Sequence, residues 1–189
     1  MFAALLDTCV LWPSLQRDVI LSFAVEGLYR PLWSDAILEE LEYHEAAKLR
    51  DRGEADAAAS LRARGLVSQM RAVFDDACVT GWQGLDGTFG LADPDDEHVV
   101  AAAVVGGAGA IVTDNLRDLR VPAVPAHIHV LTAAEFASDT VSVDPARAFR
   151  AITAVSERFR HPAMSVESIF GQLVSRYRWL DAVEMLRDV

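Results

Sequence analysis

The stretch ADPDDEHVVAAAVVGGAGAIVTDN, residues 92–115, decides the fold class, because a helix-like run is followed closely by a strand-like run. Residues 97–106 have the length of a short core helix, and three glycines between residues 106 and 109 end it. Residues 110–113, AIVT, have the length and composition of a short buried strand. Acids precede this helix and follow this strand, so charge lies directly beside two very apolar segments.

Outward from this stretch, strands and helices alternate. Residues 1–11, MFAALLDTCVL, predict a buried strand that ends near Asp7. A helix with Leu15 and Val19 at helical spacing follows, and Ser34 is a good N-cap for the next helix. Another strand is expected at 128–131. This order predicts an α/β fold in which helices cover a short, mainly parallel central sheet.

The composition limits the classes of function. A net charge of −11 disfavours a generally basic nucleic-acid binder, but it does not exclude a metal enzyme that needs local acids. The two scattered cysteines, Cys9 and Cys78, indicate thiols in a reducing compartment rather than a disulfide. The chain shows neither a signal peptide nor the roughly 20 apolar residues of a membrane helix. We therefore expect a cytoplasmic protein with no membrane partner.

Several acids lie at the ends of predicted elements. Asp7 ends the first strand, Asp93 and Asp96 flank the start of the central helix, and Asp114 follows the later strand. Each has a plain explanation as a strand-end, capping or turn residue. In open α/β sheets, however, sites form outside the carboxyl ends of the strands, so these side chains are expected to converge.

Converging carboxylates repel one another, so a cation is expected between them. Oxygen ligands favour Mg²⁺ or Mn²⁺ over zinc or copper. Ions held in this way promote attack of water on a phosphodiester. Asp95 and Glu97 are expected to be dispensable, as solvent-side or capping acids. The glycine-rich loop GWQGLDGTFG, residues 81–90, is either a flexible connection or a loop beside the site.

The order of these motifs resembles a PIN domain, of the branch found in bacterial VapC-type toxins of toxin–antitoxin pairs. The resemblance rests on LLDTCVL, S-x-x-x-x-E-E-L, D-P-D-D-x-H and I-V-T-x-N-x-x-D-L, and it covers about residues 3–136. It implies a PIN-like three-layer α/β/α sandwich. Residues 1–138 are then expected to form the nuclease domain, and 139–189 a C-terminal helical extension.

The resemblance also implies a Mg²⁺- or Mn²⁺-dependent endoribonuclease and suggests a role for each acid. The residues implied as catalytic are Asp7, Glu40, Asp96 and Asp118, with Glu39 as the register alternative to Glu40. The residues implied as metal ligands are Asp7, Asp93, Asp96, Asn115 and Asp118, and Thr113 is implied as a supporting polar residue. Asn115 departs from the family pattern, where aspartate is frequent. An amide keeps an oxygen ligand but removes a charge, which Asp118 or Asp114 could restore.

The implied partners are an RNA substrate, a small antitoxin protein and a second copy of the chain in a homodimer. The candidates for RNA contacts are Arg117, Arg120 and the arginines of the C-terminal tail, residues 139–189. The tail is either an extra helical layer or a surface for the antitoxin or the dimer. His98 is either a general base or a packed histidine. The rival interpretation is a PIN-fold binding module that has lost cleavage activity, and Asn115 is what supports it.

Overall fold

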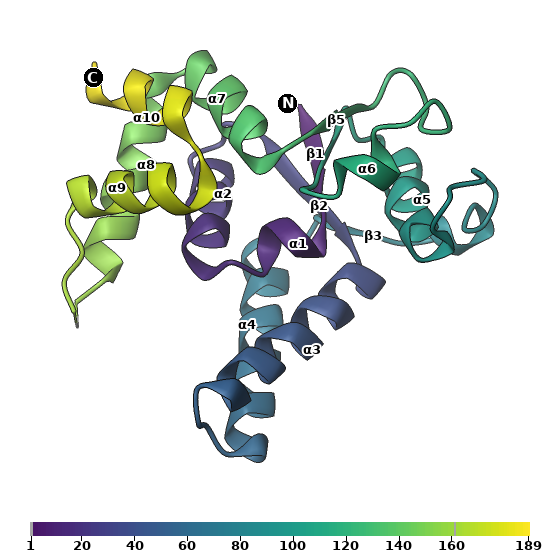
Figure 1. The fold of residues 1–189 in the computed structure, drawn as a ribbon, viewed down its shortest axis with the longest axis horizontal. Helices are drawn as coiled ribbons and strands as arrows, with labels where there is room; N and C mark the ends of the chain where they lie inside the picture. Colours follow the sequence, from purple (N-terminus) through teal and green to yellow (C-terminus); the bar gives the residue numbers. More distant parts are fainter. Residues whose placement is uncertain (1, 161) are drawn as a thin grey trace.

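A computed structural model describes residues 2–160 and 162–189 of the chain. Its centre is a five-stranded, all-parallel sheet with the strand order β3-β2-β1-β4-β5 (Figure 1). The strands are β1 (Ala3–Leu6), β2 (Arg30–Ser34), β3 (Cys78–Val79), β4 (Ala110–Val112) and β5 (His129–Leu131). The α/β prediction with a short, mainly parallel sheet is therefore confirmed.

Helices and two short 3₁₀ turns connect and cover the strands. They are α1 (Thr8–Leu11), α2 (Ser14–Val25), α3 (Asp35–Asp51), α4 (Asp56–Val73), η1 (Trp82–Gly84), η2 (Pro94–Asp96), α5 (Glu97–Gly106), α6 (Leu116–Leu119), α7 (Ala133–Val143), α8 (Pro145–Arg158), α9 (Val166–Tyr177) and α10 (Leu180–Arg187). The predicted cap of α3 is present, because the Ser34 hydroxyl accepts a hydrogen bond from the Ile37 amide at 3.2 Å. None of the described helices is long and apolar enough to cross a membrane.

Strand β3 was not expected from the sequence. It has two residues, and it pairs with the carboxyl end of β2 through Trp33 and Ser34. A strand this short has no measurable alternation of apolar and polar residues, so its position depends on its partner strand rather than on its own pattern.

Helix α5 covers one face of the sheet and packs against β1, β2 and β4. Its valines and alanines at positions 99–103 are buried. Asp96, the residue before α5, lines the same pocket as Asp7, so the helix starts beside the carboxyl end of β1. Helices α2 and α7 contact β2 and β5 and lie with the C-terminal helices on the other side (Figure 1). Helices α3 and α4 pack together as a hairpin that projects from this body.

The C-terminal helices are packed onto the rest of the chain. Helix α8 lies on α2, and α10 lies on α7 and α8. Trp179, between α9 and α10, is buried and stacks on Phe23 of α2 with ring centres 6.2 Å apart. The proposed division between residues 138 and 139 falls inside α7, and the division remains a prediction.

A glycine pair tests how closely α5 packs on the sheet. A Cβ at Gly106 would lie 2.7 Å from Val79 and 3.0 Å from Leu32, whereas a Cβ at Gly65 of α4 meets nothing within 4 Å. We predict that Gly106→Ala lowers the unfolding free energy by about 1–3 kcal/mol through overpacking. The matched control, Gly65→Ala, should raise it by up to about 1 kcal/mol. Urea unfolding measures both, and a stable Gly106→Ala protein would contradict the described packing.

Candidate active site

The strand order places a crevice between β1 and β4. The chain runs outward from β1 to β2 and β3, then returns to the other side of β1 as β4, so connections leave these two neighbours in opposite directions. Such a switch point opens a crevice at the carboxyl ends of the strands. An open pocket of about 430 Å³ lies here, and Asp7, Thr8, Cys9, Trp12, Glu40, His44, Asp96 and Asn115 line it.

Asp7 is the most deeply held acid of the pocket. It directly follows β1, and only 8% of its surface is exposed. One carboxylate oxygen accepts a hydrogen bond from the Thr8 amide at 2.6 Å, and the other accepts one from the Thr113 hydroxyl at 2.6 Å. A buried carboxylate needs such partners. Thr113, at the end of β4, therefore fixes Asp7 in the crevice.

Asp96 lies across the pocket at the start of α5. Its side chain caps no helix, and it accepts a hydrogen bond from the Asn115 side-chain amide at 2.8 Å. Burial, and then the charges of Asp7, Asp93 and Asp118, raise the pKa of Asp96 to about 6. Asp93 instead caps η2, because its carboxylate accepts a hydrogen bond from the Asp95 amide at 3.0 Å.

Glu40 reaches the pocket from α3. The Thr8 hydroxyl donates to one of its oxygens at 2.7 Å, and Nε2 of His98 lies 3.3 Å from the other. The hydrogen bond from His98 lowers the pKa of Glu40 more than burial raises it. Burial lowers the pKa of His98, but Glu40 outweighs this effect and the pKa is raised. Glu39, the register alternative, instead lines a different pocket beside Glu42 and Tyr43.

The remaining predicted residues lie around this centre rather than in it. Asn115 lines the pocket, and its backbone amide donates to the Thr113 hydroxyl at 2.9 Å. Asp93, Asp114 and Asp118 are not among the residues that line it, although Asp93 and Asp118 act on the pKa of Asp96 through their charge. The structure thus brings together Asp7, Glu40, Asp96 and Asn115 of the predicted set.

The oxygen donors of the pocket suit a hard divalent cation, but the described acids do not form a complete set of metal ligands. Within residues 2–160 and 162–189, no group of three or more His, Cys, Asp and Glu side chains is arranged to hold a metal ion. The pKa of Asp96 is nevertheless raised, first by burial and then by the neighbouring carboxylates of Asp7, Asp93 and Asp118, and a bound cation would oppose both effects. A half-turn of the Asn115 amide would offer its oxygen in place of its nitrogen.

A family model described as PIN domain matches residues 3–117. The chain belongs to the PIN domain family. PIN domains are generally nucleases, so membership indicates a nuclease-type activity on nucleic acid. No curated protein and no solved structure matches the chain. The matched segment contains β1 to β4 and the acids that line the pocket, whereas β5 and the C-terminal helices lie beyond it.

Four residues that line the pocket of this PIN domain were not predicted from the sequence: Thr8, Cys9, Trp12 and His44. Two of them, Thr8 and Cys9, contact the acids directly. Thr8 joins Asp7 to Glu40, and its position directly after the strand-end acid was the available signal. The Cys9 thiol lies 3.2 Å from a carboxylate oxygen of Asp7 and accepts a hydrogen bond from the Asp114 amide. Burial, and then the charge of Asp7, raise the pKa of Cys9 to about 12, so it stays a thiol at neutral pH.

The prediction that Glu97 is a solvent-side or capping acid is wrong. Glu97 is only 3% exposed, and its two oxygens accept hydrogen bonds from the amides of Phe89 and Leu91 at 2.8 and 2.7 Å. Burial alone would raise its pKa, but the backbone amides of the loop outweigh burial and lower it. Glu97 therefore anchors the glycine-rich loop of this PIN domain to the start of α5, and no sequence spacing signals such a contact.

Asp96 gives a pH-dependent prediction for the metal-free protein. Because its folded-state pKa is about 6 against an ordinary 3.8, ionised Asp96 destabilises the fold, and the penalty develops as the pH rises from about 4 to about 6. We predict that Asp96→Asn raises the melting temperature by a few degrees at pH 7.5 and by much less at pH 4.5.

Thermal unfolding in EDTA at the two pH values measures this difference. Asp95→Asn is the matched control, because Asp95 is an exposed acid one residue away. Equal shifts at both pH values, or equal shifts for the two variants, would show that Asp96 carries no charge penalty.

Proposed function

We propose that this PIN domain is a Mg²⁺- or Mn²⁺-dependent endoribonuclease that hydrolyses phosphodiester bonds of RNA in the cytoplasm. One observation carries the proposal: Asp7 and Asp96 face the same open pocket, and their mutual repulsion contributes to the raised pKa of Asp96. In the described part of the chain, no lysine or arginine lines this pocket to neutralise them. A bound divalent cation would remove the repulsion.

Each acid of the pocket has a role in the proposed reaction. Asp7 and Asp96 would hold the ion, with Asn115 as a neutral oxygen ligand, and Asp93 and Asp118 would add negative potential from nearby. A bound ion activates water and stabilises negative charge on the phosphate oxygens. Glu40 is ionised at neutral pH because its pKa is lowered. Its carboxylate, held by Thr8 and His98, would orient the attacking water and take its proton.

We further propose that the chain is the toxin of a type II toxin–antitoxin pair and acts as a homodimer. The order of motifs resembling VapC-type toxins supports this assignment, because family membership alone leaves the biological role open. A small antitoxin could offer arginine to the acid pocket, where a guanidinium would replace the metal ion as counter-charge. A short reading frame for a small DNA-binding protein beside the gene would strengthen this assignment.

A second candidate function is a binding module that keeps the PIN fold without cleavage. Asn115 favours it, because this pocket residue has an amide where a carboxylate is frequent in the family. Two features count against it: Asp7, Glu40 and Asp96 are all retained, and hydrogen bonds hold each of them in the pocket.

Cleavage of a fluorogenic RNA with Mn²⁺ separates the two candidates. We predict that Asp96→Asn lowers kcat at least about a hundredfold, and that Glu40→Gln lowers it by a comparable factor through loss of proton transfer. Glu39→Gln is the matched control on the same helix and should retain wild-type kcat, because Glu39 lies in another pocket. EDTA should abolish cleavage. A wild-type protein that neither binds Mn²⁺ nor cuts RNA would favour the binding module.

A further inference from the structure

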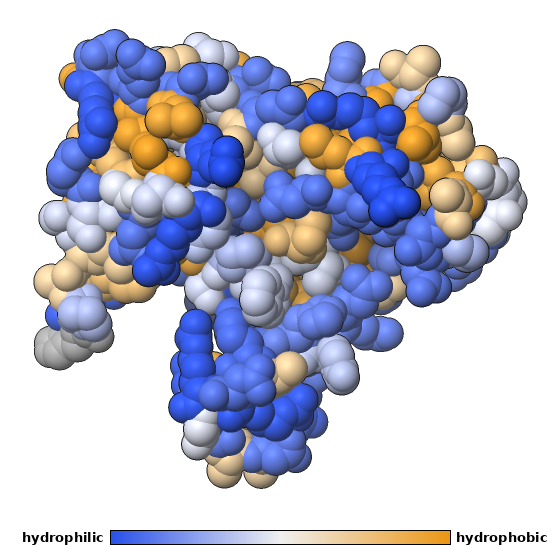
Figure 2. Space-filling view, in the orientation of Figure 1, coloured by the Kyte–Doolittle hydropathy of each residue, from blue (hydrophilic) through white to orange (hydrophobic). Residues whose placement is uncertain are grey.

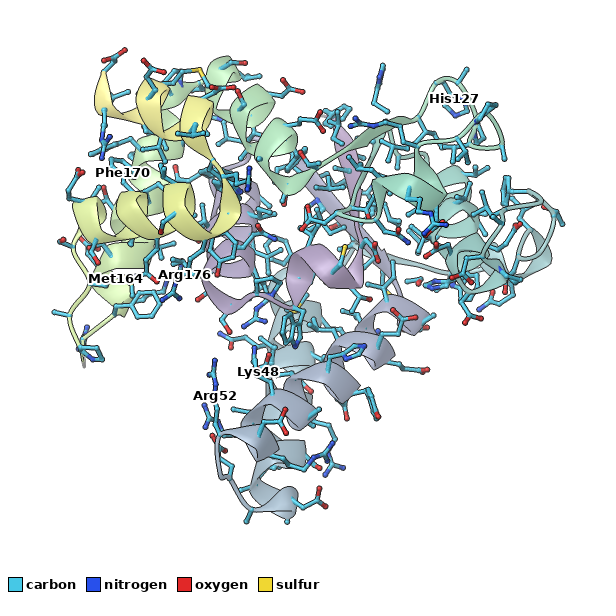
Figure 3. The ribbon with its side chains drawn as sticks, viewed as in Figure 1. Lys48, Arg52, His127, Met164, Phe170 and Arg176 are labelled. Atoms are coloured by element: carbon cyan, nitrogen blue, oxygen red, sulfur yellow. The ribbon has the colours of Figure 1, made fainter. Side chains whose placement is uncertain are left out.

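A second cleft adjoins the acid pocket. It has a volume of about 420 Å³ and lies where the segment after α1 and the end of α3 meet the C-terminal helices. Trp12 lines both the cleft and the acid pocket, so the two adjoin at this side chain. In Figure 3, Lys48 and Arg52 lie on the α3 side of this cleft, and Met164 and Arg176 on the α9 side. We call it the basic cleft.

The charge of the basic cleft is opposite to that of the acid pocket and of the chain as a whole. Lys48, Arg52 and Arg176 line it, and no acid does so in the described part of the chain, although the net charge is −11. Lys48 is fixed there by hydrogen bonds to the Trp12 carbonyl at 3.2 Å and the Ser14 hydroxyl at 3.0 Å, and by an ion pair with Glu45.

Arg52 and Arg176 differ from most arginines of this protein. Both are exposed, and neither has a carboxylate partner within residues 2–160 and 162–189. The arginines that form ion pairs with acids are Arg17, Arg30, Arg50, Arg62, Arg71, Arg120, Arg147, Arg150 and Arg187. Unpaired guanidinium groups facing one cleft suit a ligand that brings several negative charges.

Aromatic rings accompany these cations. Trp12 is 42% exposed, whereas the other three tryptophans are buried, and Lys48 Nζ lies 5.5 Å from its ring centre. Phe159 and Tyr177, both partly buried, also line the cleft. An exposed ring beside cationic side chains is a surface on which a base can stack while phosphates are neutralised. Figure 2 shows the corresponding face of the molecule, hollowed between the C-terminal helices and the α3–α4 hairpin.

We propose that the basic cleft binds the single-stranded RNA segment next to the bond cut in the acid pocket. Arg52 and Arg176 contact phosphates, and a base stacks on Trp12 as the strand passes from one pocket to the other. This inference rests on the proposed ribonuclease function. It also gives the C-terminal helices a role, because Phe159, Arg176 and Tyr177 lie beyond the segment matched by the PIN domain model.

RNA binding with and without the two arginines tests this proposal. The protein carries Asp96→Asn to prevent cleavage, and the probe is a fluorescein-labelled 12-nucleotide single-stranded RNA of mixed sequence. We expect Arg52→Ala with Arg176→Ala to raise Kd about tenfold and to lower the slope of log Kd against log salt by about 1.4, or 0.7 for each lost phosphate contact.

Arg62→Ala with Arg64→Ala on α4 is the matched control. It removes the same charge from exposed positions outside the basic cleft, and it should change Kd less than twofold. RNA should also quench the tryptophan fluorescence of the protein, and Trp12→Phe should remove most of this quenching. An unchanged affinity and salt slope after loss of Arg52 and Arg176 overturns the proposal. So does quenching by polyglutamate without quenching by RNA, which would indicate an acidic protein partner.

Cleavage kinetics of the protein with Asp96 intact keep the two proposals separable. If both hold, Arg52→Ala with Arg176→Ala raises KM and leaves kcat unchanged. Arginine-dependent RNA binding by a protein that cuts no RNA would overturn the proposed nuclease function but not the proposed RNA binding by the basic cleft. RNA cleavage with the same KM in the wild type and the double variant would overturn the proposed RNA binding by the basic cleft but not the proposed nuclease function.

Discussion

The repulsion between Asp7 and Asp96 is the constraint on which the site depends. Neither acid can move far from the other, because Asp7 follows a buried strand and Asp96 opens a helix packed on the same sheet. The apolar runs of β1, β4 and α5 hold negative charge in place against repulsion, and burial strengthens that repulsion. A cation is the simplest counter-charge for such an arrangement.

Hydrogen bonds between different helices and strands hold the acids of the pocket in position. Thr113 ties β4 to Asp7, Thr8 ties α1 to Glu40, and His98 ties α5 to the same glutamate. Trp82 packs beside His98 with ring centres 5.9 Å apart, so the glycine-rich loop also contacts the site. Glu97 holds that loop by its backbone amides. Residues next to the acids therefore hold the acidic side chains in place.

The sequence predicted the elements whose signals are local. The strand that ends at Asp7, the cap at Ser34 and the helix–strand pair at 97–112 follow from apolar runs, capping residues and glycines. The convergence of Asp7 and Asp96 could be expected because parallel strands end at one edge of the sheet. Resemblance to a family supplied the position of Glu40, which its own spacing did not single out.

Features that depend on distant partners could not be predicted in this way. Strand β3 exists because β2 offers an edge, and Glu97 is buried because a loop folds back on it. The basic cleft joins residues as far apart as Trp12 and Arg176, which only the packing of the C-terminal helices brings together. Arg120, a candidate for RNA contacts, instead pairs with Glu135.

In the proposed nuclease, Asp7 and Asp96 share a divalent ion. The most direct measurement is an anomalous difference map from crystals grown with Mn²⁺. We predict one strong peak within coordination distance of carboxylate oxygens of both Asp7 and Asp96, and the loss of this peak in crystals of Asp96→Asn. A map with no peak between these two acids, at a Mn²⁺ concentration that supports activity, would show that they do not share an ion.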